Sequence, residues 1–198
     1  MAQNMSRKLF VAVPQALHQA REYYKKLFGK YLFITNTVSY VTLFGLGDAL
    51  TQLMERRMRG EDRNHDFRRS LCVIAFASFQ GPVNHFWYLG LDKFIKGTIH
   101  RTVFKKVLAD QLVFAPYACT SFYLGLGLLE GQTLKTTVSE TKEKFLPTYI
   151  ADLSVWPAAQ LLNFYVVPSH LRMMYINFVT LLWNTFMSYM KHKGVTSS

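Results

Sequence analysis

The stretch "WPAAQLLNFYVVPSHLRMMYINFVTLLWNTF", residues 156–186, decides the fold of this chain. It is mostly apolar, yet amide and hydroxyl side chains recur in it at helical spacing. At 100° per residue, Trp156, Gln160 and Asn163 fall on one face of a helix. The following helix repeats the pattern with the polar residues Asn177, Thr180, Asn184 and Ser188. The sequence therefore predicts two apolar helices that each carry a polar stripe.

Charge is absent from long parts of the chain. Windows of 17 to 22 residues contain no Asp, Glu, Lys or Arg, and they are residues 31–47, 70–91, 111–129, 153–169 and 173–190. A soluble amphipathic helix would carry a charged stripe along its outer face, whereas about 20 apolar residues cross a bilayer core. We therefore predict an all-α fold, a polytopic transmembrane helical bundle of four or five spans covering residues 31–190.

Basic residues gather between and before these windows, and the net charge is +11. The connections Arg56 to Arg69 and Lys93 to Lys106 are of the kind that meets anionic headgroups. Residues 1–30 hold six Lys or Arg against one acid, Glu22, which is typical of a mitochondrial targeting segment or of a basic juxtamembrane helix. Residues 133–149 are expected to form an amphipathic or connecting helix, and residues 191–198 a short polar tail.

Two parts of the chain resemble each other weakly. "GLGDALTQ" at 45–52 matches "GLGLLEGQ" at 125–132 with an offset of 80, and "HFWYL" at 85–89 matches "NFYVV" at 163–167 with an offset of 78. One interpretation is a duplicated two-span unit, repeated in parallel, with the last window added. The other is coincidence among residues that are common in membranes.

The other windows also carry polar stripes, which are Thr35, Ser39 and Thr42; Ser78, His85 and Asp92; and Asp110, Tyr117 and Ser121. In hydrocarbon such groups must face neighbouring helices or a wet cavity, because leaving them unpaired costs several kcal/mol. They either bond the helices together or line a path for small solutes or ions. Asn163, Gln160, His85 and Asp92 are the candidate lining residues of such a path.

No catalytic, cofactor or metal motif is present in the sequence. H-E-x-x-H, C-x-x-C and G-x-S-x-G do not occur, so we expect neither an enzyme nor a bound cofactor or metal. Cys72 and Cys119 form no spaced pair and are interpreted as packing residues. The glycine pair Gly45 and Gly47, with its counterpart at 125 and 127, is expected to permit close helix approach.

Three motifs carry a family resemblance. They are "GPVNHFWYLGLD" at 81–92, "KKVLADQLVFAP" at 105–116, and the opening stretch. Together they resemble the Mpv family, also called the twenty-two-kilodalton peroxisomal membrane protein family. The residues that carry the resemblance, our candidate functional residues, are Gly81, Pro82, His85, Trp87, Tyr88, Asp92, Asp110, Gln111, Trp156, Pro157, Gln160, Asn163, Phe164, Pro168, Arg172, Tyr175, Trp183 and Asn184.

The resemblance is nearest to the Mpv-like protein 2 branch, on "LGLGLLEGQT" at 124–133 and "EKF" at 143–145. It implies a mitochondrial inner membrane protein that supports mitochondrial homeostasis, with a role in ribosome assembly and translation. The peroxisomal membrane is the alternative location. The family carries no known catalytic residues to this chain.

Two functional hypotheses follow. In the first, the bundle is an interaction protein whose basic connections contact mitochondrial ribosomal subunits or anionic lipid, a contact that would be sensitive to salt. In the second, it is a non-selective channel or carrier for small solutes. A homo-oligomer is compatible with both, and no small-molecule substrate is identified from the residues.

Overall fold

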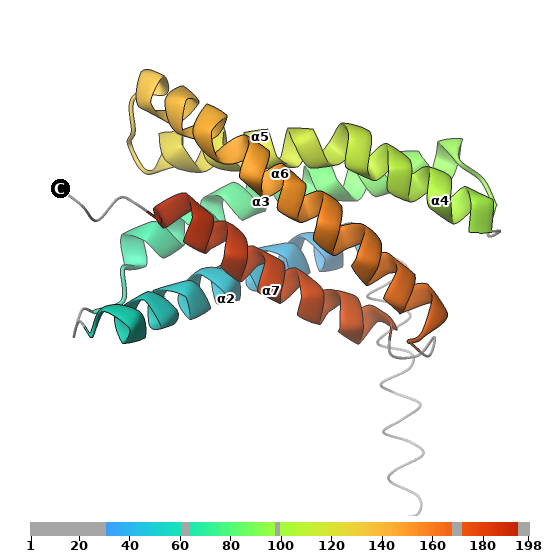
Figure 1. The fold of residues 1–198 in the computed structure, drawn as a ribbon, viewed down its shortest axis with the longest axis horizontal. Helices are drawn as coiled ribbons and strands as arrows, with labels where there is room; N and C mark the ends of the chain where they lie inside the picture. The colour runs from blue at the N-terminus through green and yellow to red at the C-terminus, as the bar shows by residue number, and fades with distance from the viewer. Residues whose placement is uncertain (1–30, 61–63, 98–99, 168–171, 194–198) are drawn as a thin grey trace, which may run out of the picture.

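The computed structural model describes residues 31–60, 64–97, 100–167 and 172–193, and within them the regular structure is entirely helical. The elements are α2 (Leu32–Arg59), α3 (Phe67–Phe94), α4 (His100–Ala109), the π-helix η1 (Asp110–Phe114), α5 (Ala115–Leu129), α6 (Leu134–Tyr165) and α7 (Arg172–His192) (Figure 1). The all-α prediction is confirmed. The predicted segment 1–30 lies outside the described residues.

Local signals explain where the helices begin and end. The side chain of Asp66 accepts a hydrogen bond from the Arg69 backbone amide at the start of α3, and Thr133 caps α6 in the same way through Thr136. Such caps satisfy amides that have no partner within the helix. At the other ends, Gly60 follows α2 with φ 61° and Gly131 follows α5 with φ 87°. Both conformations favour glycine. Gly131 therefore forms part of the turn between α5 and α6.

A proline explains the π-helix. In η1 the Ala115 amide bonds to the Asp110 carbonyl five residues back, and the next amide in this pattern would belong to Pro116, which has none. The Gln111 carbonyl that is left over accepts a hydrogen bond from the Tyr149 hydroxyl of α6 at 2.9 Å. A tertiary contact therefore completes the backbone, and α4, η1 and α5 form one continuous helix.

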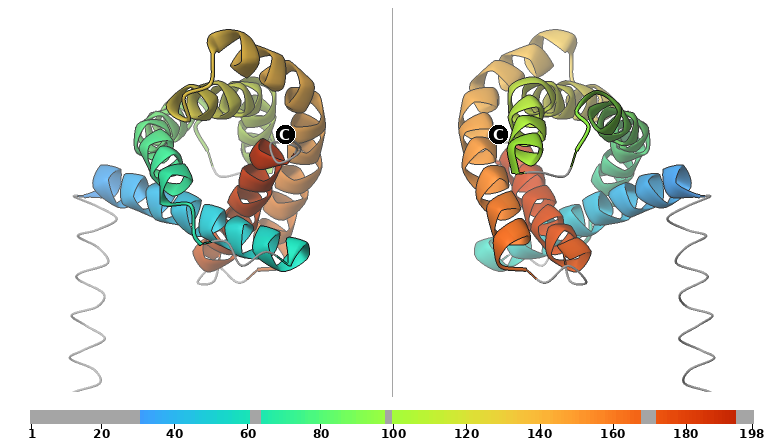
Figure 2. Two further views of the ribbon diagram at one scale, coloured as in Figure 1. Left: turned by 90° about the vertical axis from the view of Figure 1, so that its left-hand side faces the viewer. Right: turned by 90° about the vertical axis from the view of Figure 1, so that its right-hand side faces the viewer.

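The helices form two antiparallel hairpins and a fifth element. α2 packs on α3, α5 packs on α6, and α7 packs on both α2 and α6. α2, α5 and α7 run in one direction and α3 and α6 in the other, and Figure 2 shows the helices surrounding a central axis. This arrangement agrees with a two-span unit repeated in parallel. Gln52 of α2 accepts a hydrogen bond from the Asp66 amide in the connection that follows, whereas Gln132 lies in the connection after α5 and accepts one from Thr137 of α6. The duplication itself stays a prediction.

Polar and apolar side chains are distributed in the opposite way to those of a soluble protein. The compact apolar cluster is small and consists of Phe44, Val73, Phe76, Ala77, Phe122, Tyr123, Leu126 and Met187. Among the described residues, 15 polar or charged side chains are buried against 12 hydrophobic ones, while large side chains such as Phe79, Phe94 and Phe104 are exposed. Soluble proteins bury apolar residues preferentially, so this chain has a polar interior and an apolar surface.

The described residues of the windows without charge lie in these helices, except Tyr31, Val166 and Val167. Two other expectations differ from the structure. The connecting helix expected at 133–149 is not separate, because α6 continues through Pro147 and Pro157 into the fourth window. Lys191 and His192, which we expected in a polar tail, belong to the last turn of α7. By length and composition, one helix of the described residues, Arg101–Leu129, is apolar enough to cross a membrane. The polar stripes lower the hydropathy of the others.

Candidate functional site

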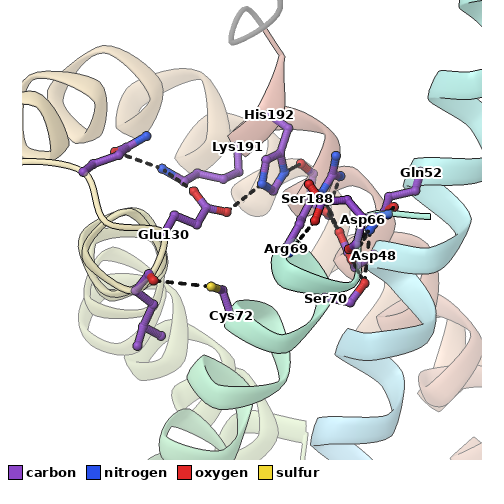
Figure 3. A network of polar contacts seen from close by, with 12 residues as sticks. Asp48, Gln52, Asp66, Arg69, Ser70, Cys72, Glu130, Ser188, Lys191 and His192 are labelled. Atoms are coloured by element: carbon purple, nitrogen blue, oxygen red, sulfur yellow. Dashed lines mark hydrogen bonds and ion pairs between the residues drawn. The ribbon is translucent and has the colours of Figure 1, made fainter. Parts of the chain in front are cut away.

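Asp48 is the centre of a buried cluster of polar residues at one end of the bundle (Figure 3). Its carboxylate is fully buried and forms an ion pair with Arg69 at 2.8 Å. It also accepts hydrogen bonds from Ser70 of α3 and Ser188 of α7, both at 2.7 Å, and from Gln52 at 2.9 Å. One carboxylate therefore holds three helices together.

The surroundings of Asp48 keep it charged. Burial by itself raises the pKa of this carboxyl, but Arg69 and the hydrogen bonds from Ser70, Ser188 and Gln52 outweigh burial, so that the pKa lies below its ordinary value of 3.8. Arg69 also bonds to Glu55 at 2.7 Å. A buried charge of this kind is tolerated because every partner is present.

Lys191 is the centre of a second cluster at the same end. Only 1% of it is exposed, and its ammonium lies 2.6 Å from Glu140 of α6 and 3.6 Å from Glu130. Lys144 bonds to Glu140 at 2.8 Å and donates to the Lys191 carbonyl. The last turn of α7 is thus fixed against the connection between α5 and α6.

His192 joins the two clusters. One ring nitrogen, Nε2, lies 2.7 Å from the Glu130 carboxylate, and the other, Nδ1, lies 2.8 Å from the Ser188 carbonyl. The hydroxyl of the same serine donates to Asp48. Both partners of the ring are hydrogen-bond acceptors. The end of α7 therefore links the turns of the two hairpins in one network (Figure 3).

Further along the bundle, the interior is polar but incompletely bonded. Gln80 of α3 is buried, and its carbonyl oxygen accepts long hydrogen bonds of 3.4 Å from Tyr117 and Ser121. Within the described part of the chain, five buried side-chain atoms have no hydrogen-bond partner, and they are Gln80 Nε2, Gln111 Oε1, Asp152 Oδ1, Asn163 Oδ1 and Asn184 Nδ2. Such groups are rare in folded proteins without water or a ligand beside them.

The motif residues of α3 take different positions. His85 is buried and bonds to Asn36 of α2 at 3.0 Å, and Gly81 brings α3 close to Thr37. Trp87 donates to Asp110 at 2.9 Å. Asp92 departs from the predicted lining role, because its side chain is 68% exposed and pairs with Lys106 at 2.7 Å. Pro82 lies within α3, and Tyr88 is exposed.

The motif residues of α6 and α7 lie mostly along their contact. Trp156 and Trp183 meet edge to face with ring centres 6.2 Å apart, and Asn163 and Asn184 are buried. Pro157, Gln160 and Tyr175 are half-buried. Pro168 and the side chains of Phe164 and Arg172 lie outside the described part.

The two charged clusters lie outside the motifs that the sequence predicts as functional. The polar stripe of α7 continues from Asn184 and Ser188 to Lys191 at intervals of four and three residues, and this spacing was the available signal. No group of three or more His, Cys, Asp or Glu suited to a metal occurs in the described ranges. A shallow apolar groove of about 400 Å³ lies on the surface between α3 and η1–α5, lined by Val83, Trp87, Val113, Phe114 and Tyr117.

Comparisons with known proteins agree with the motifs. A family model described as "Mpv17 / PMP22 family" matches residues 127–188. The chain is 35% identical to PXMP2/4 family protein 2 of Dictyostelium discoideum over 176 residues, 83% of this chain and 91% of the relative. It is 36% identical to the mitochondrial inner membrane protein Mpv17 of Homo sapiens over 154 residues, 77% and 86% of the two chains.

The corresponding protein of Danio rerio is 32% identical over 172 residues, 86% of this chain and 96% of the relative. No solved structure matches the chain. The assignment to the Mpv-like protein 2 branch stays a prediction. These relatives and the shared motifs identify the chain as a mitochondrial inner membrane protein that belongs to the Mpv17/PMP22 family.

Proposed function

We propose that this protein is a polytopic bundle whose polar interior conducts water and small solutes across the mitochondrial inner membrane. The observation that carries the proposal is the set of five buried polar atoms without a partner, which come from α3, η1, α6 and α7. Four segments of the bundle thus turn unsatisfied polar groups inward. The five-span topology is part of this proposal.

The distribution of side chains supports membrane embedding. The exposed surface carries large apolar residues on each of the long helices, for example Leu46, Phe79, Leu112, Leu161 and Phe178. An apolar surface of this extent is favourable in hydrocarbon and would aggregate in water. Charged residues of the two clusters border the windows without charge, since Asp48, Glu130 and Lys191 each directly follow one window and Arg69 directly precedes another.

The unpaired atoms support a wet interior. An amide or carboxyl group that is transferred out of water without a partner costs about 2–7 kcal/mol, and five such atoms would offset much of the stability of a domain. Ordered water with two to four polar partners removes this cost. Water inside a bundle that crosses a membrane is the first requirement for conduction.

Reconstitution tests the proposal. Purified protein in liposomes is expected to release a small entrapped neutral solute, such as glycerol, faster than protein-free liposomes do. Asn163→Leu removes a buried polar group and is expected to alter the rate of release. Asp92→Asn is the matched control, because Asp92 is exposed at a helix end, and it should leave the rate unchanged. Release equal to that of empty liposomes would refute the proposal.

A second proposal, contact with mitochondrial ribosomal subunits that supports their assembly and translation, is favoured by exposed basic residues such as Arg57, Arg68, Lys93 and Lys105. The two basic connections lie at opposite ends of α3, which is 28 residues or about 42 Å long. If α3 crosses the membrane, a partner on one side reaches only one of them. Arg69 is also engaged by Asp48 and Glu55, so the available surface is smaller than the sequence predicts.

The salt dependence of ribosome binding distinguishes this second proposal from the first. Isolated inner membranes would be washed at rising salt, and ribosomal subunits held through Arg57 and Arg68 should be released, since contacts to phosphate weaken with salt. Charge reversal at both positions should release them at lower salt. Retention that is independent of salt and of both arginines would argue against the contact.

A further inference from the structure

Two carboxylates and an amide meet in the interior where η1 faces α6. Asp110 and Gln111 are the first two residues of η1, and Asp152 lies in the middle of α6. The Tyr149 hydroxyl, one turn before Asp152 on α6, bonds to the Gln111 carbonyl at 2.9 Å, so this part of α6 lies against η1. The Asp152 carboxyl interacts with the Gln111 side chain. Residues from two segments, 41 positions apart, therefore form one oxygen-rich cluster.

Two acceptor oxygens in this cluster have no partner. Asp152 is 6% exposed and Gln111 is 5% exposed, and Asp152 Oδ1 and Gln111 Oε1 are buried without a hydrogen-bond donor. When Asp152 is ionised, both atoms are lone-pair acceptors and cannot satisfy each other. Within the described residues, these two oxygens lack a donor or a positively charged partner.

The described residues do not supply that group. Among the described residues, the ion pairs of Arg69, Lys106, Lys144, Lys191 and His192 are made with other acids. Asp110 receives a hydrogen bond from Trp87 at 2.9 Å, which orients its carboxylate without neutralising it. Asp152 has no such donor on Oδ1.

The site is held in a fixed geometry. Pro116 causes the π-turn that carries Asp110 and Gln111, and the Tyr149 hydroxyl holds the Gln111 carbonyl. Tyr149 lies one turn before Asp152 on α6, so the same helix positions both the anchor and the second carboxylate. π-turns of this kind are common where a protein forms a functional site.

We propose that Asp152, Gln111 and Asp110 form a binding site for a hard cation, an alkali or alkaline-earth ion bound through oxygen. The inference rests on the proposed function, because such an ion reaches the buried cluster through the wet interior. Carboxylate and amide oxygens are the ligands that these ions select. An ionised Asp152 carboxylate with an unpaired, buried oxygen is unfavourable, and a cation bound beside it would offset that cost.

Trp87 is a built-in reporter of this site. The chain has three tryptophans, so Trp156→Phe with Trp183→Phe leaves Trp87, whose indole bonds to Asp110, as the sole source of tryptophan emission. The purified protein in detergent would be titrated with KCl, NaCl, MgCl2 and CaCl2, with choline chloride keeping the ionic strength constant. We expect a saturable change in emission with at least one of the four cations, which also distinguishes an alkali from an alkaline-earth ion.

Variants assign the response to the cluster. Asp152→Asn removes one charge at constant size and should weaken the apparent affinity at least about tenfold, and Gln111→Leu should weaken it as well. Asp92→Asn, in the exposed pair with Lys106, should leave it unchanged. If Asp152→Asn does not fold, the titration of the parent protein alone decides. A response that is linear, or equal for choline and the metal ions, would overturn the proposal, and so would saturation unaltered by both variants.

Binding and conduction fail separately in these assays. Glycerol release without a saturable Trp87 response retains the pathway and refutes the cation site. If the protein releases no solute but shows a saturable Trp87 response that Asp152→Asn abolishes, the cation site stands and the conduction pathway is refuted. If the Asp152 carboxyl is instead protonated, lowering the pH will change Trp87 emission while no metal ion does, which also overturns the site.

Discussion

Gly47 of α2 lies in direct contact with Asn184 of α7. A Cβ atom at Gly47 would be 2.8 Å from the Asn184 Cβ and 2.9 Å from the backbone carbonyl carbon of the same residue. One turn later, Thr51 donates a hydrogen bond to the Thr185 carbonyl at 2.8 Å. The contact that joins the first hairpin to α7 therefore depends on the absence of a side chain at one position.

Gly47→Ala is expected to separate α2 from α7. Backbone atoms cannot move aside at low cost, so we expect a loss of about 1–3 kcal/mol, despite a gain in helix propensity of about 1 kcal/mol. Thermal unfolding in detergent measures the effect. Gly90→Ala is the matched control, because a Cβ there meets nothing within 4 Å, and it should be neutral or stabilising. Equal melting temperatures for the two variants would contradict the close contact.

The sequence predicts the helices better than their connections. Absence of charge over 17 to 22 residues located the apolar segments, because an ion is costly in hydrocarbon and its absence is visible locally. The joining of residues 133–149 to the fourth window was not predicted. Pro147 indicates a helix end, but α6 continues through it, since neighbouring groups can replace a single backbone hydrogen bond.

The candidate site was predicted in part. Periodicity assigned Asn163 and Asn184 to inward stripes, and both are buried. Periodicity gave Asp92 the same inward role, although the residue lies at a helix end and pairs with Lys106. Periodicity specifies the face of a helix but not the position of a residue along the bundle. The partners of Lys191 are Glu130, in the connection between α5 and α6, and Glu140 of α6. Contacts of this kind depend on how the hairpins pack, which one sequence does not specify.

Lys191→Met tests the second charged cluster. The change keeps an unbranched chain of similar length but leaves Glu130 and Glu140 without their shared cation, which should cost about 3 kcal/mol and lower the melting temperature by roughly 6–12 °C. Lys142→Met on the exposed face of α6 is the control and should change little. If the two variants have the same melting temperature, the Lys191 ion pairs contribute no stability.

The pH dependence of stability provides a test of Glu140. Burial raises the pKa of this carboxyl, but hydrogen bonds and charge from Lys144 and Lys191 outweigh it and hold the pKa below its ordinary value of 4.5. The stabilisation is therefore fully present above pH 4.5 and is lost as the pH falls through the lower pKa of the folded protein.

Unfolding of Glu140→Gln at pH 7 and at pH 4 measures this contribution. The variant should be less stable than the parent protein at pH 7, and the difference should shrink toward low pH. Glu143→Gln, on the exposed face of the same helix, should follow the parent protein at both values. A constant difference between Glu140→Gln and the parent would show that Glu140 titrates alike in the folded and unfolded chains.

The π-turn predicts coupling between Tyr149 and Pro116. Tyr149→Phe leaves the Gln111 carbonyl without its donor and should cost about 1–3 kcal/mol. Pro116→Ala supplies a backbone amide that can bond to this carbonyl, so the double variant should lose less stability than Tyr149→Phe does in the parent protein. A double-mutant cycle on unfolding free energies checks this, and strictly additive effects would mean that the hydroxyl does not replace the missing amide.

The central claim is that polar residues face a wet interior while apolar residues face lipid. Cysteine accessibility in proteoliposomes tests it most directly, in protein with Cys72→Ala and Cys119→Ala. Gln80 is 1% exposed and Leu112 is 63% exposed in the structure. We predict that a small, charged thiol reagent modifies Gln80→Cys from water and spares Leu112→Cys. Modification of Leu112→Cys with protection of Gln80→Cys would contradict the account, because it would place water outside the bundle and a dry core within.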